Sequence, residues 1–172
     1  MIALEKLLET DHPVLIRPVG LSMHPFIRRD DRIVIESGAG ADVSRISFGQ
    51  CVIFRSGGER WLIHRIIGRK NREGQIITKG DALVRSDRPV DQKNIRGVIT
   101  GIERAGSKRF YRLDRGWRKR ASSLIAFLSC LESFFSRFLP KTVPRRKEGR
   151  PDPLLGRIIK APKWLLTRLL FP

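Results

Sequence analysis

A serine, a histidine and two aspartates lie in separate stretches whose residue types suit a single hydrolytic site. Ser22 stands in front of a Met-His-Pro turn, and His64 alternates with apolar neighbours in a strand-like run. A serine hydroxyl is a weak nucleophile near neutral pH, so it needs a positioned base, for which His64 is the best candidate. The imidazole in turn needs a carboxylate to fix its tautomer, and Asp81 and Asp87 both follow the next strand-like run.

Residues beside the serine fit a substrate-binding turn. Gly20 removes a side chain next to Ser22, so an extended substrate backbone can come close, and Pro25 restrains the turn. We expect the backbone N–H of Ser22 to hold the oxyanion, with Gly20 and Met23 as the flanking substrate and oxyanion positions.

None of these features is decisive alone. A serine beside a methionine, a histidine among apolar strand residues and a Gly-Asp pair after a strand are each more typical of structural positions. The functional prediction therefore depends on the order in which the stretches occur.

Short β-branched runs separated by glycine turns predict a mainly β domain over residues 1–113, with a curled, barrel-like antiparallel sheet. A short amphipathic helix is expected within residues 1–10. The predicted strands are residues 14–19, 32–36, 50–55, 59–67, 75–79 and 93–102, with 110–113 as a last candidate. Hairpin turns are expected at 56–58 and 71–74, and Gly97 is expected to mark a bulge or a close approach.

The chain changes character towards its end. Residues 104–172 hold 18 Lys and Arg against 4 Asp and Glu, whereas residues 1–103 hold 17 and 13, which gives the total of +18. Such an uneven distribution predicts a basic extension over residues 114–172 that binds a polyanion.

The extension contains two amphipathic stretches, at residues 122–139 and 154–171, joined by a polar linker at 140–153. A basic patch at 115–120 precedes them, and Pro162 is expected to break or kink the second stretch. We expect peripheral contact with an anionic membrane surface, mainly through 154–171, because Glu132 and Arg137 interrupt the first stretch.

The histidines and cysteines predict no metal, cofactor or disulfide. Cys51 and Cys130 show no CxxC spacing, and the three histidines lack the spacing of metal ligands.

Five sequence boxes in order resemble the type I signal peptidase family, which belongs to a superfamily with the LexA-type self-cleaving repressors. They are Ser-Met-His-Pro at 22–25, Asp-Asp-Arg-Ile-Val at 30–34, Gly-Gln-Cys-Val-Ile-Phe at 49–54, His-Arg-Ile-Ile at 64–67 and Lys-Gly-Asp at 79–81. The resemblance covers roughly residues 14–102 and implies a signal-peptidase catalytic core.

His64 stands where most bacterial members of that family have lysine, so the chain is similar to the histidine subgroup of endoplasmic reticulum, archaeal and some bacterial signal peptidases. In that subgroup an aspartate six residues beyond the Gly-Asp box completes the site, and counting from Asp81 leads to Asp87. The resemblance implies Ser22 as nucleophile, His64 as general base and Asp87 as its partner, with Asp81 structural or supporting.

The chain departs from the family pattern at Gly20, where many members have a serine that aids the oxyanion, and in the absence of the family's N-terminal membrane anchor. The resemblance implies a serine endopeptidase that cleaves signal or leader peptides of exported polypeptides. Two alternatives stay open: a LexA-like regulatory or nucleic-acid-associated protein, and a non-catalytic binding module. Only about twenty residues precede the serine box, too few for a helix-turn-helix domain, so nucleic acid is not the expected partner.

Overall fold

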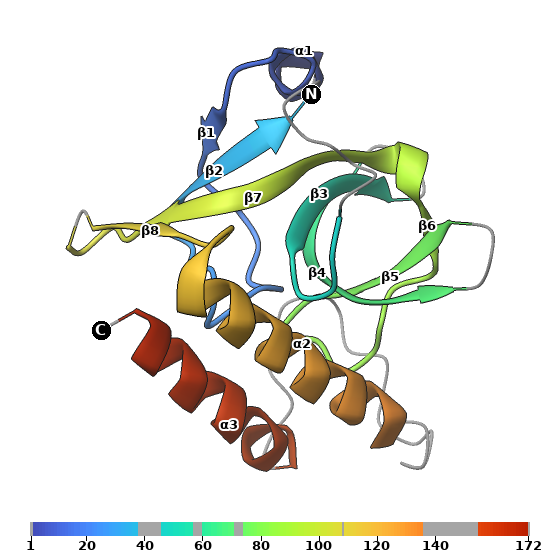
Figure 1. Cartoon of the computed structure of the whole chain (residues 1–172), viewed down its shortest axis with the longest axis vertical. Helices are drawn as coiled ribbons and strands as arrows, with labels where there is room; N and C mark the ends of the chain where they lie inside the picture. The colour runs from blue at the N-terminus through green and yellow to red at the C-terminus, as the bar shows by residue number, and fades with distance from the viewer. Residues whose placement is uncertain are drawn as a thin grey trace.

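The computed structural model describes residues 2–37, 46–56, 60–70, 74–107, 109–135 and 155–171 (Figure 1). The strands are β1 (Val14–Ile16), β2 (Arg32–Ser37), β3 (Cys51–Ser56), β4 (Arg60–Lys70), β5 (Gln75–Lys79), β6 (Val90–Asp91), β7 (Ile95–Glu103) and β8 (Phe110–Arg112). The α-helices are α1 (Ile2–Leu8), α2 (Gly116–Phe135) and α3 (Leu155–Leu170). The predicted turns at 57–58 and 71–73 and the linker at 140–153 lie outside the described residues.

The strands form one antiparallel sheet in the order β1-β2-β7-β3-β4-β5-β6, and β8 pairs with β7 off this path. The prediction of a mainly β, antiparallel and curled sheet is confirmed, because β3 to β6 bend strongly in Figure 1. Of the curled and barrel-like alternatives the curled one holds, since the sheet stays open between β1 and β6 and does not close into a barrel. These terminal strands have only three and two residues, so they offer too few backbone groups to close a ladder.

Gly97 behaves as its position in a strand predicted. The β3–β7 register shifts between Ile53 and Phe54, which pair with Gly97 and Ile95, so the ladder bulges here. A Cβ on Gly97 would lie 2.5 Å from the side chain of Ile35, so the neighbouring strand approaches too closely for any other residue.

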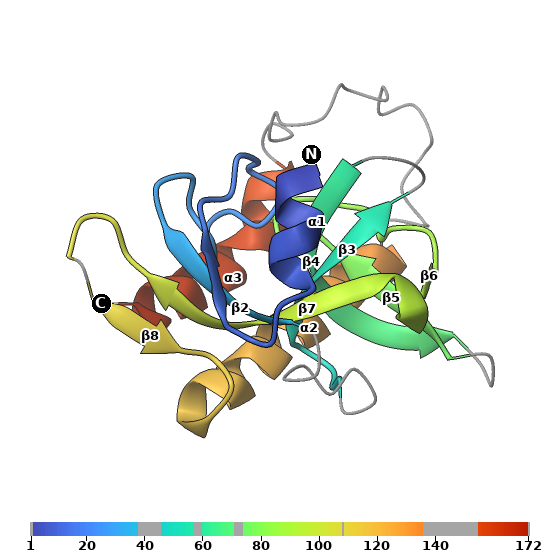
Figure 2. The same ribbon diagram turned by 90° about the horizontal axis from the view of Figure 1, so that it is seen from above.

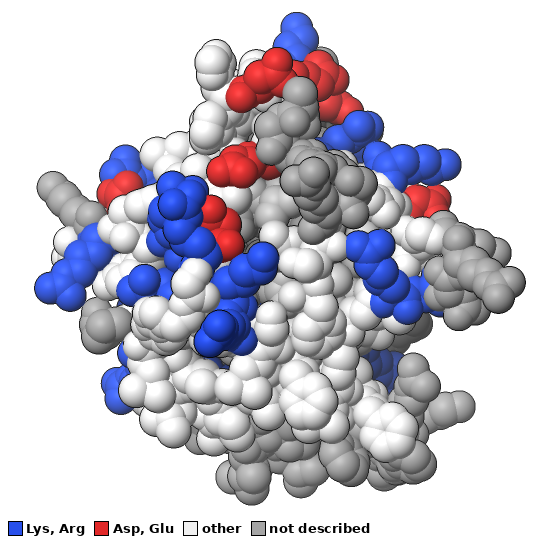
Figure 3. All heavy atoms as spheres, viewed as in Figure 1, with Lys and Arg blue, Asp and Glu red and all other residues white. Residues whose placement is uncertain are grey.

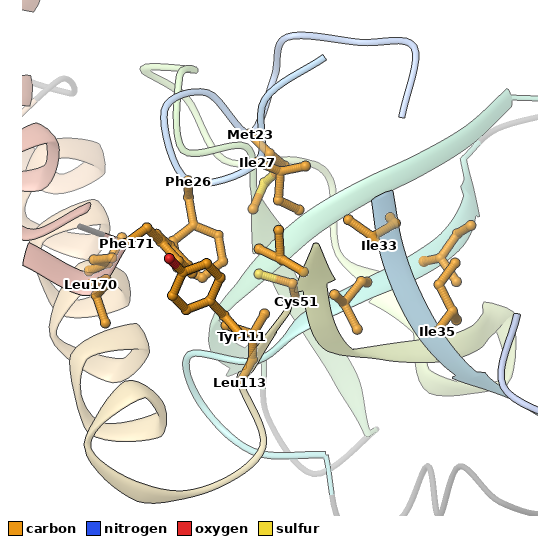
Figure 4. Packing of buried hydrophobic residues seen from close by; sticks show 14 of the residues in the cluster. Met23, Phe26, Ile27, Ile33, Ile35, Cys51, Tyr111, Leu113, Leu170 and Phe171 are labelled. Atoms are coloured by element: carbon orange, nitrogen blue, oxygen red, sulfur yellow. The ribbon is translucent and has the colours of Figure 1, made fainter. Parts of the chain in front are cut away.

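The core lies on both sides of the sheet because the central strand β3 is covered on both faces. Alternate side chains of a strand point in opposite directions. Cys51 and Ile53 belong to the cluster under the serine turn (Figure 4), whereas Val52 and Phe54 belong to the cluster inside the curl of the sheet. All four are buried to 2% exposure or less, which explains why β3 reads as a continuous apolar run.

Helices α2 and α3 pack side by side at one end of the molecule, whereas α1 lies at the other end in Figure 1; Figure 2 shows the same arrangement from above. The chain end joins the main core, because the Phe171 ring meets those of Phe26 and Tyr111 edge-on at 5.4 and 5.1 Å between centroids. The 114–172 extension therefore shares its core with residues 1–113.

Two expectations about these helices are corrected. The basic patch at 115–120 belongs largely to the first turns of α2, which begins at Gly116 rather than near 122. Of the break or kink expected at Pro162, the break is excluded, since α3 continues through this residue from Leu155 to Leu170. Within the described residues, no helix has both the length and the apolar character needed to span a membrane.

Candidate active site

His64 and Asp87 meet at the end of the β4–β5 hairpin. The β4–β5 register pairs Arg65 with Lys79, and continuing it places His64 opposite Gly80, at the start of the loop that leads to Asp87. The loop folds back on β5, because the Asp87 backbone N–H donates to the Thr78 carbonyl at 2.8 Å. This brings Oδ2 of Asp87 to 2.6 Å from Nδ1 of His64.

The hydrogen bonds of Asp87 fix the state of the imidazole. A carboxylate only accepts hydrogen bonds, so Nδ1 of His64 carries a proton, and in the neutral imidazole Nε2 then has the lone pair. The same Oδ2 atom also accepts a hydrogen bond from the Thr78 hydroxyl at 2.7 Å. Asp87 is thereby oriented from a second direction, and the imidazole is held in the tautomer that a general base needs.

The other imidazole nitrogen is buried and has no partner. His64 is 2% exposed, and its Nε2 makes no hydrogen bond to any part of the chain that the structure describes. Buried polar atoms are almost always hydrogen-bonded, so such an atom calls for an explanation. A basic nitrogen kept free for a reacting hydroxyl is one.

Gly80 brings this nitrogen close to the serine turn. A Cβ on Gly80 would lie 3.0 Å from Nε2 of His64 and 2.7 Å from the backbone carbonyl oxygen of Ser22. Both groups therefore converge on one glycine that has no side chain to separate them. Even an alanine at this position would push the serine turn and the imidazole apart.

The turn that carries Ser22 is anchored on both sides. The Ser22 carbonyl accepts a hydrogen bond from the Ala82 N–H at 2.8 Å, which ties the turn to the loop after β5. Met23, Phe26 and Ile27 are each at most 4% exposed and hold the turn in the core (Figure 4). Ser22 itself is half-buried, and the neighbouring Leu21 is 38% exposed, so the serine lies where a bound chain can reach it.

Asp81 pairs with Arg65 rather than with His64. Nε and Nη2 of Arg65 donate to the two carboxylate oxygens at 2.9 and 2.7 Å, and both side chains are at most 2% exposed. From the residue types alone, Asp81 and Asp87 were both candidate partners of His64. In the structure, His64 contacts Asp87.

Arg65 also links the site to its surroundings. Its Nη1 donates to the Gly49 carbonyl at 2.9 Å and to the Ser122 hydroxyl on α2, while its guanidinium lies 4.2 Å from the Phe26 ring centroid. Burial works to lower the pKa of Arg65, but the Asp81 carboxylate outweighs it and raises that pKa. The pair therefore stays ionised and holds the elements around the site in place; we call Arg65 with Asp81 the brace of the site.

A second buried ion cluster lies just beside the first. Glu132 on α2 accepts hydrogen bonds through Oε2 from Lys79 on β5 and from Lys163 on α3, and all three side chains are at most 2% exposed. Burial and the neighbouring Lys163 lower the pKa of Lys79 to about 8, although Glu132 acts in the opposite direction. This cluster joins both helices to the strand that leads into Gly80.

The remaining predicted site residues are placed differently from one another. Gly20 is exposed, and a Cβ added to it would meet nothing within 4 Å, so the space beside the serine turn is open. Met23 is 4% exposed and packs in the core, so its side chain cannot line a substrate site. Only its backbone is left for the role that the sequence suggested.

Three contributors were missed at the sequence level: Arg65, Thr78 and Gly80. The sequence shows Gly80 as part of a Gly-Asp pair, but no local pattern shows that this glycine faces Ser22 and His64. Consecutive residues of a strand point to opposite faces, so His64 and Arg65 do not face the same carboxylate. This indicates that Asp81 and Asp87 have different basic partners.

Neither cysteine offers a competing nucleophile. Burial raises the pKa of Cys51 to about 12, and the pKa of Cys130 is raised by the same cause. Thiols that do not ionise near neutral pH are poor nucleophiles. Among the described residues, no three His, Cys, Asp or Glu side chains gather in a way that could hold a metal ion.

The geometry thus brings a half-buried serine turn and the unpartnered nitrogen of His64 together at Gly80, and Asp87 binds the other nitrogen of His64. Comparisons of the chain with protein-family models, with curated proteins and with solved structures gave no match.

Proposed function

We propose that this protein is a serine endopeptidase in which Ser22 is the nucleophile, His64 the general base and Asp87 its orienting partner. One observation carries the proposal. His64 binds Asp87 through Nδ1 at 2.6 Å, while its buried Nε2 is left without a partner next to the Ser22 turn. A purely structural histidine would satisfy both ring nitrogens.

The arrangement supports acyl transfer in two steps. Nε2 of His64 takes the proton of the Ser22 hydroxyl as its oxygen bonds to the carbonyl carbon of a peptide. The imidazolium that forms is stabilised by Asp87 and then gives its proton to the leaving amine, which leaves an acyl group on Ser22. Water, activated by the same nitrogen, hydrolyses that ester and restores the serine. The Ser22 backbone N–H is the proposed oxyanion donor.

The proposed substrates are signal or leader peptides of exported polypeptides. Support comes from the five boxes between residues 22 and 81 and from the His64 and Asp87 pairing that the histidine subgroup implies. An extended peptide fits the site because Gly20 leaves open space beside the serine turn.

The test replaces Asp87 while leaving the fold intact. Purified protein is incubated with a library of leader-like peptides, and cleavage products are identified by mass spectrometry. For a peptide that is cut, Asp87→Asn should lower kcat/KM by about 10,000-fold, because the asparagine holds the wrong imidazole tautomer.

Asp91→Asn is the matched control, since Asp91 is a partly exposed carboxylate bonded to Gln75 at 3.2 Å. The control should cleave like the wild type. Equal activity of Asp87→Asn and the control, or no cleavage of any peptide by well-folded wild type, would contradict the proposal.

A further inference from the structure

Helix α2 has a buried face and, on its opposite side, an exposed apolar face. One face packs on the sheet with Ser122, Ile125, Ala126, Ser129 and Glu132, all at most 6% exposed. The other presents an outer stripe of four large apolar side chains to solvent: Leu124, Phe127, Leu131 and Phe134, at 46, 54, 39 and 55% exposure. Their spacing of three, four and three residues makes a continuous stripe along the helix.

This stripe is not explained by the core. A surface helix of a soluble domain needs one apolar face, and the inner face of α2 already supplies it. Contiguous exposed apolar side chains mark a surface that something else covers. The neighbouring helix α3 adds three more at the same end of the molecule: Trp164, Leu165 and Leu169, at 44, 58 and 62% exposure.

The sequence reading of these helices is revised by two facts. Glu132 was expected to interrupt the apolar face of the first stretch, but it is 3% exposed and points inward to Lys79 and Lys163. On α3, by contrast, Leu170 and the adjoining Phe171 are buried in the core, so only part of its apolar side is available. The stripe of α2 is therefore the stronger contact surface.

The exposed charges at the start of α2 are mostly positive. Exposed Lys119 and Arg120 lie at the start of α2, and Arg115, just before the helix, pairs with Asp114. The one acidic residue of the helix, Glu132, is buried. Figure 3 shows uncharged atoms over α2 with Lys and Arg gathered towards its N-terminal end. On α3, the guanidinium of Arg168 lies 4.0 Å from the Trp164 ring centroid.

We infer that the outer stripe of α2 docks on the surface of an anionic lipid bilayer. Phenylalanine, leucine and tryptophan side chains enter the boundary between headgroups and acyl chains, and the surrounding Lys and Arg bind lipid phosphates. The inner face of the same helix contacts Arg65 through Ser122, which connects the docked helix to the Arg65–Asp81 pair under the Ser22 site. The inference does not depend on peptidase activity.

A second copy of the chain fits the stripe less well. A twofold contact places the same patch of both copies face to face. Both copies would contribute a surface whose exposed charges on α2, Lys119 and Arg120, are positive, and no exposed acidic residue of α2 is there to pair with them. An anionic bilayer supplies both the apolar layer and the opposite charge.

The experiment compares vesicle binding of the full chain and of two double variants. Phe127→Ser with Leu131→Ser removes the centre of the stripe. Leu7→Ser with Leu15→Ser removes two leucines of 49% exposure each at the other end of the molecule and is the matched control. Co-sedimentation uses vesicles of phosphatidylcholine alone and of phosphatidylcholine with phosphatidylglycerol.

Wild type and control should bind the phosphatidylglycerol vesicles, bind phosphatidylcholine poorly and lose affinity in high salt. The stripe variant should bind about tenfold more weakly or worse, since two large apolar side chains no longer insert. Equal binding by the stripe variant and the control would overturn the inference. So would a wild-type dimer that the stripe variant disrupts, without any vesicle binding.

Tryptophan quenching by brominated lipid keeps the inference testable should the stripe variant misfold. In a protein whose Trp61 and Trp164 are changed to Phe, the fluorescence of Trp117, which is 51% exposed on α2 two helical turns before Leu124, should be quenched by brominated phosphatidylglycerol vesicles. Bound protein whose Trp117 is not quenched would place the contact elsewhere and overturn the inference.

Discussion

Lys79 and Asp81 flank Gly80, yet they belong to buried ion clusters of different composition. Asp81 and Arg65 form a balanced pair, joined by two hydrogen bonds at 2.9 and 2.7 Å. Lys79 shares Glu132 with Lys163, so two positive groups face one negative group in an equally buried place. The first cluster lies under the serine turn, and the second fastens both C-terminal helices.

The comparison shows that burial alone does not decide what an ion cluster does. The balanced pair keeps its charges, because each partner stabilises the ionised form of the other. The unbalanced cluster carries a surplus charge in an apolar place, and the pKa of Lys79 falls to about 8 as a result. We therefore expect the Arg65–Asp81 pair to be insensitive to pH. The attachment of α2 and α3 to β5 through Glu132 should depend on pH.

The largest effect should come from breaking the balanced pair. Arg65→Met leaves the Asp81 carboxylate buried without a counter-charge and removes the donor to Gly49 and Ser122. The free energy of unfolding, measured by urea denaturation, should fall by about 3–5 kcal/mol.

The control for this variant is Arg112→Met, whose exposed pair with Asp114 has side-chain exposures of 47 and 26%. It should cost far less stability than Arg65→Met, because an exposed ion pair contributes little. Equal losses for the two variants would mean that Arg65 is not the brace.

The smaller effect belongs to the unbalanced cluster. Lys79→Met removes the surplus charge and leaves Glu132 with Lys163 as a balanced pair. At pH 7 the free energy of unfolding should be equal to or higher than that of wild type, because an ion of high desolvation cost is replaced by an apolar side chain.

The pH dependence sharpens this prediction. Lys79 has a pKa of about 8 in the folded chain and 10.5 as the reference for an unfolded one. Between these values the unfolded state binds more protons, so the free energy of unfolding of the wild type should rise with pH, by about 3 kcal/mol in all. Other lysines titrate there too, so the measurement is the difference from Lys79→Met, which should lack this rise. Parallel curves for the two proteins would show that Lys79 titrates normally.

The sequence predicted the parts of this fold that depend on local patterns. The long strands β2, β3, β4, β5 and β7 appear close to their predicted limits, because alternation and glycine turns are local signals. Strand β6 was missed because two residues carry no such pattern. Whether the sheet closes could not be predicted, because closure depends on how its end strands meet in space.

The site divides in the same way. Ser22, His64 and Asp87 were selected by the order of the boxes, and His64 and Asp87 lie in contact. The support around them was not visible, since Glu132 stands 53 positions from Lys79 and 31 from Lys163. From the sequence, Glu132 was expected to interrupt an apolar helix face, whereas in the structure it is the counter-charge for two buried lysines.

The most direct test of the central claim is the rate at which Ser22→Ala cleaves a peptide that the wild type cuts. Ser56→Ala, at an exposed serine at the end of β3, is the matched control, and both variants should keep the wild-type melting temperature. Cleavage should be abolished in Ser22→Ala and unchanged in Ser56→Ala, because only Ser22 supplies the attacking oxygen. Full cleavage by pure Ser22→Ala would contradict the assignment of the nucleophile.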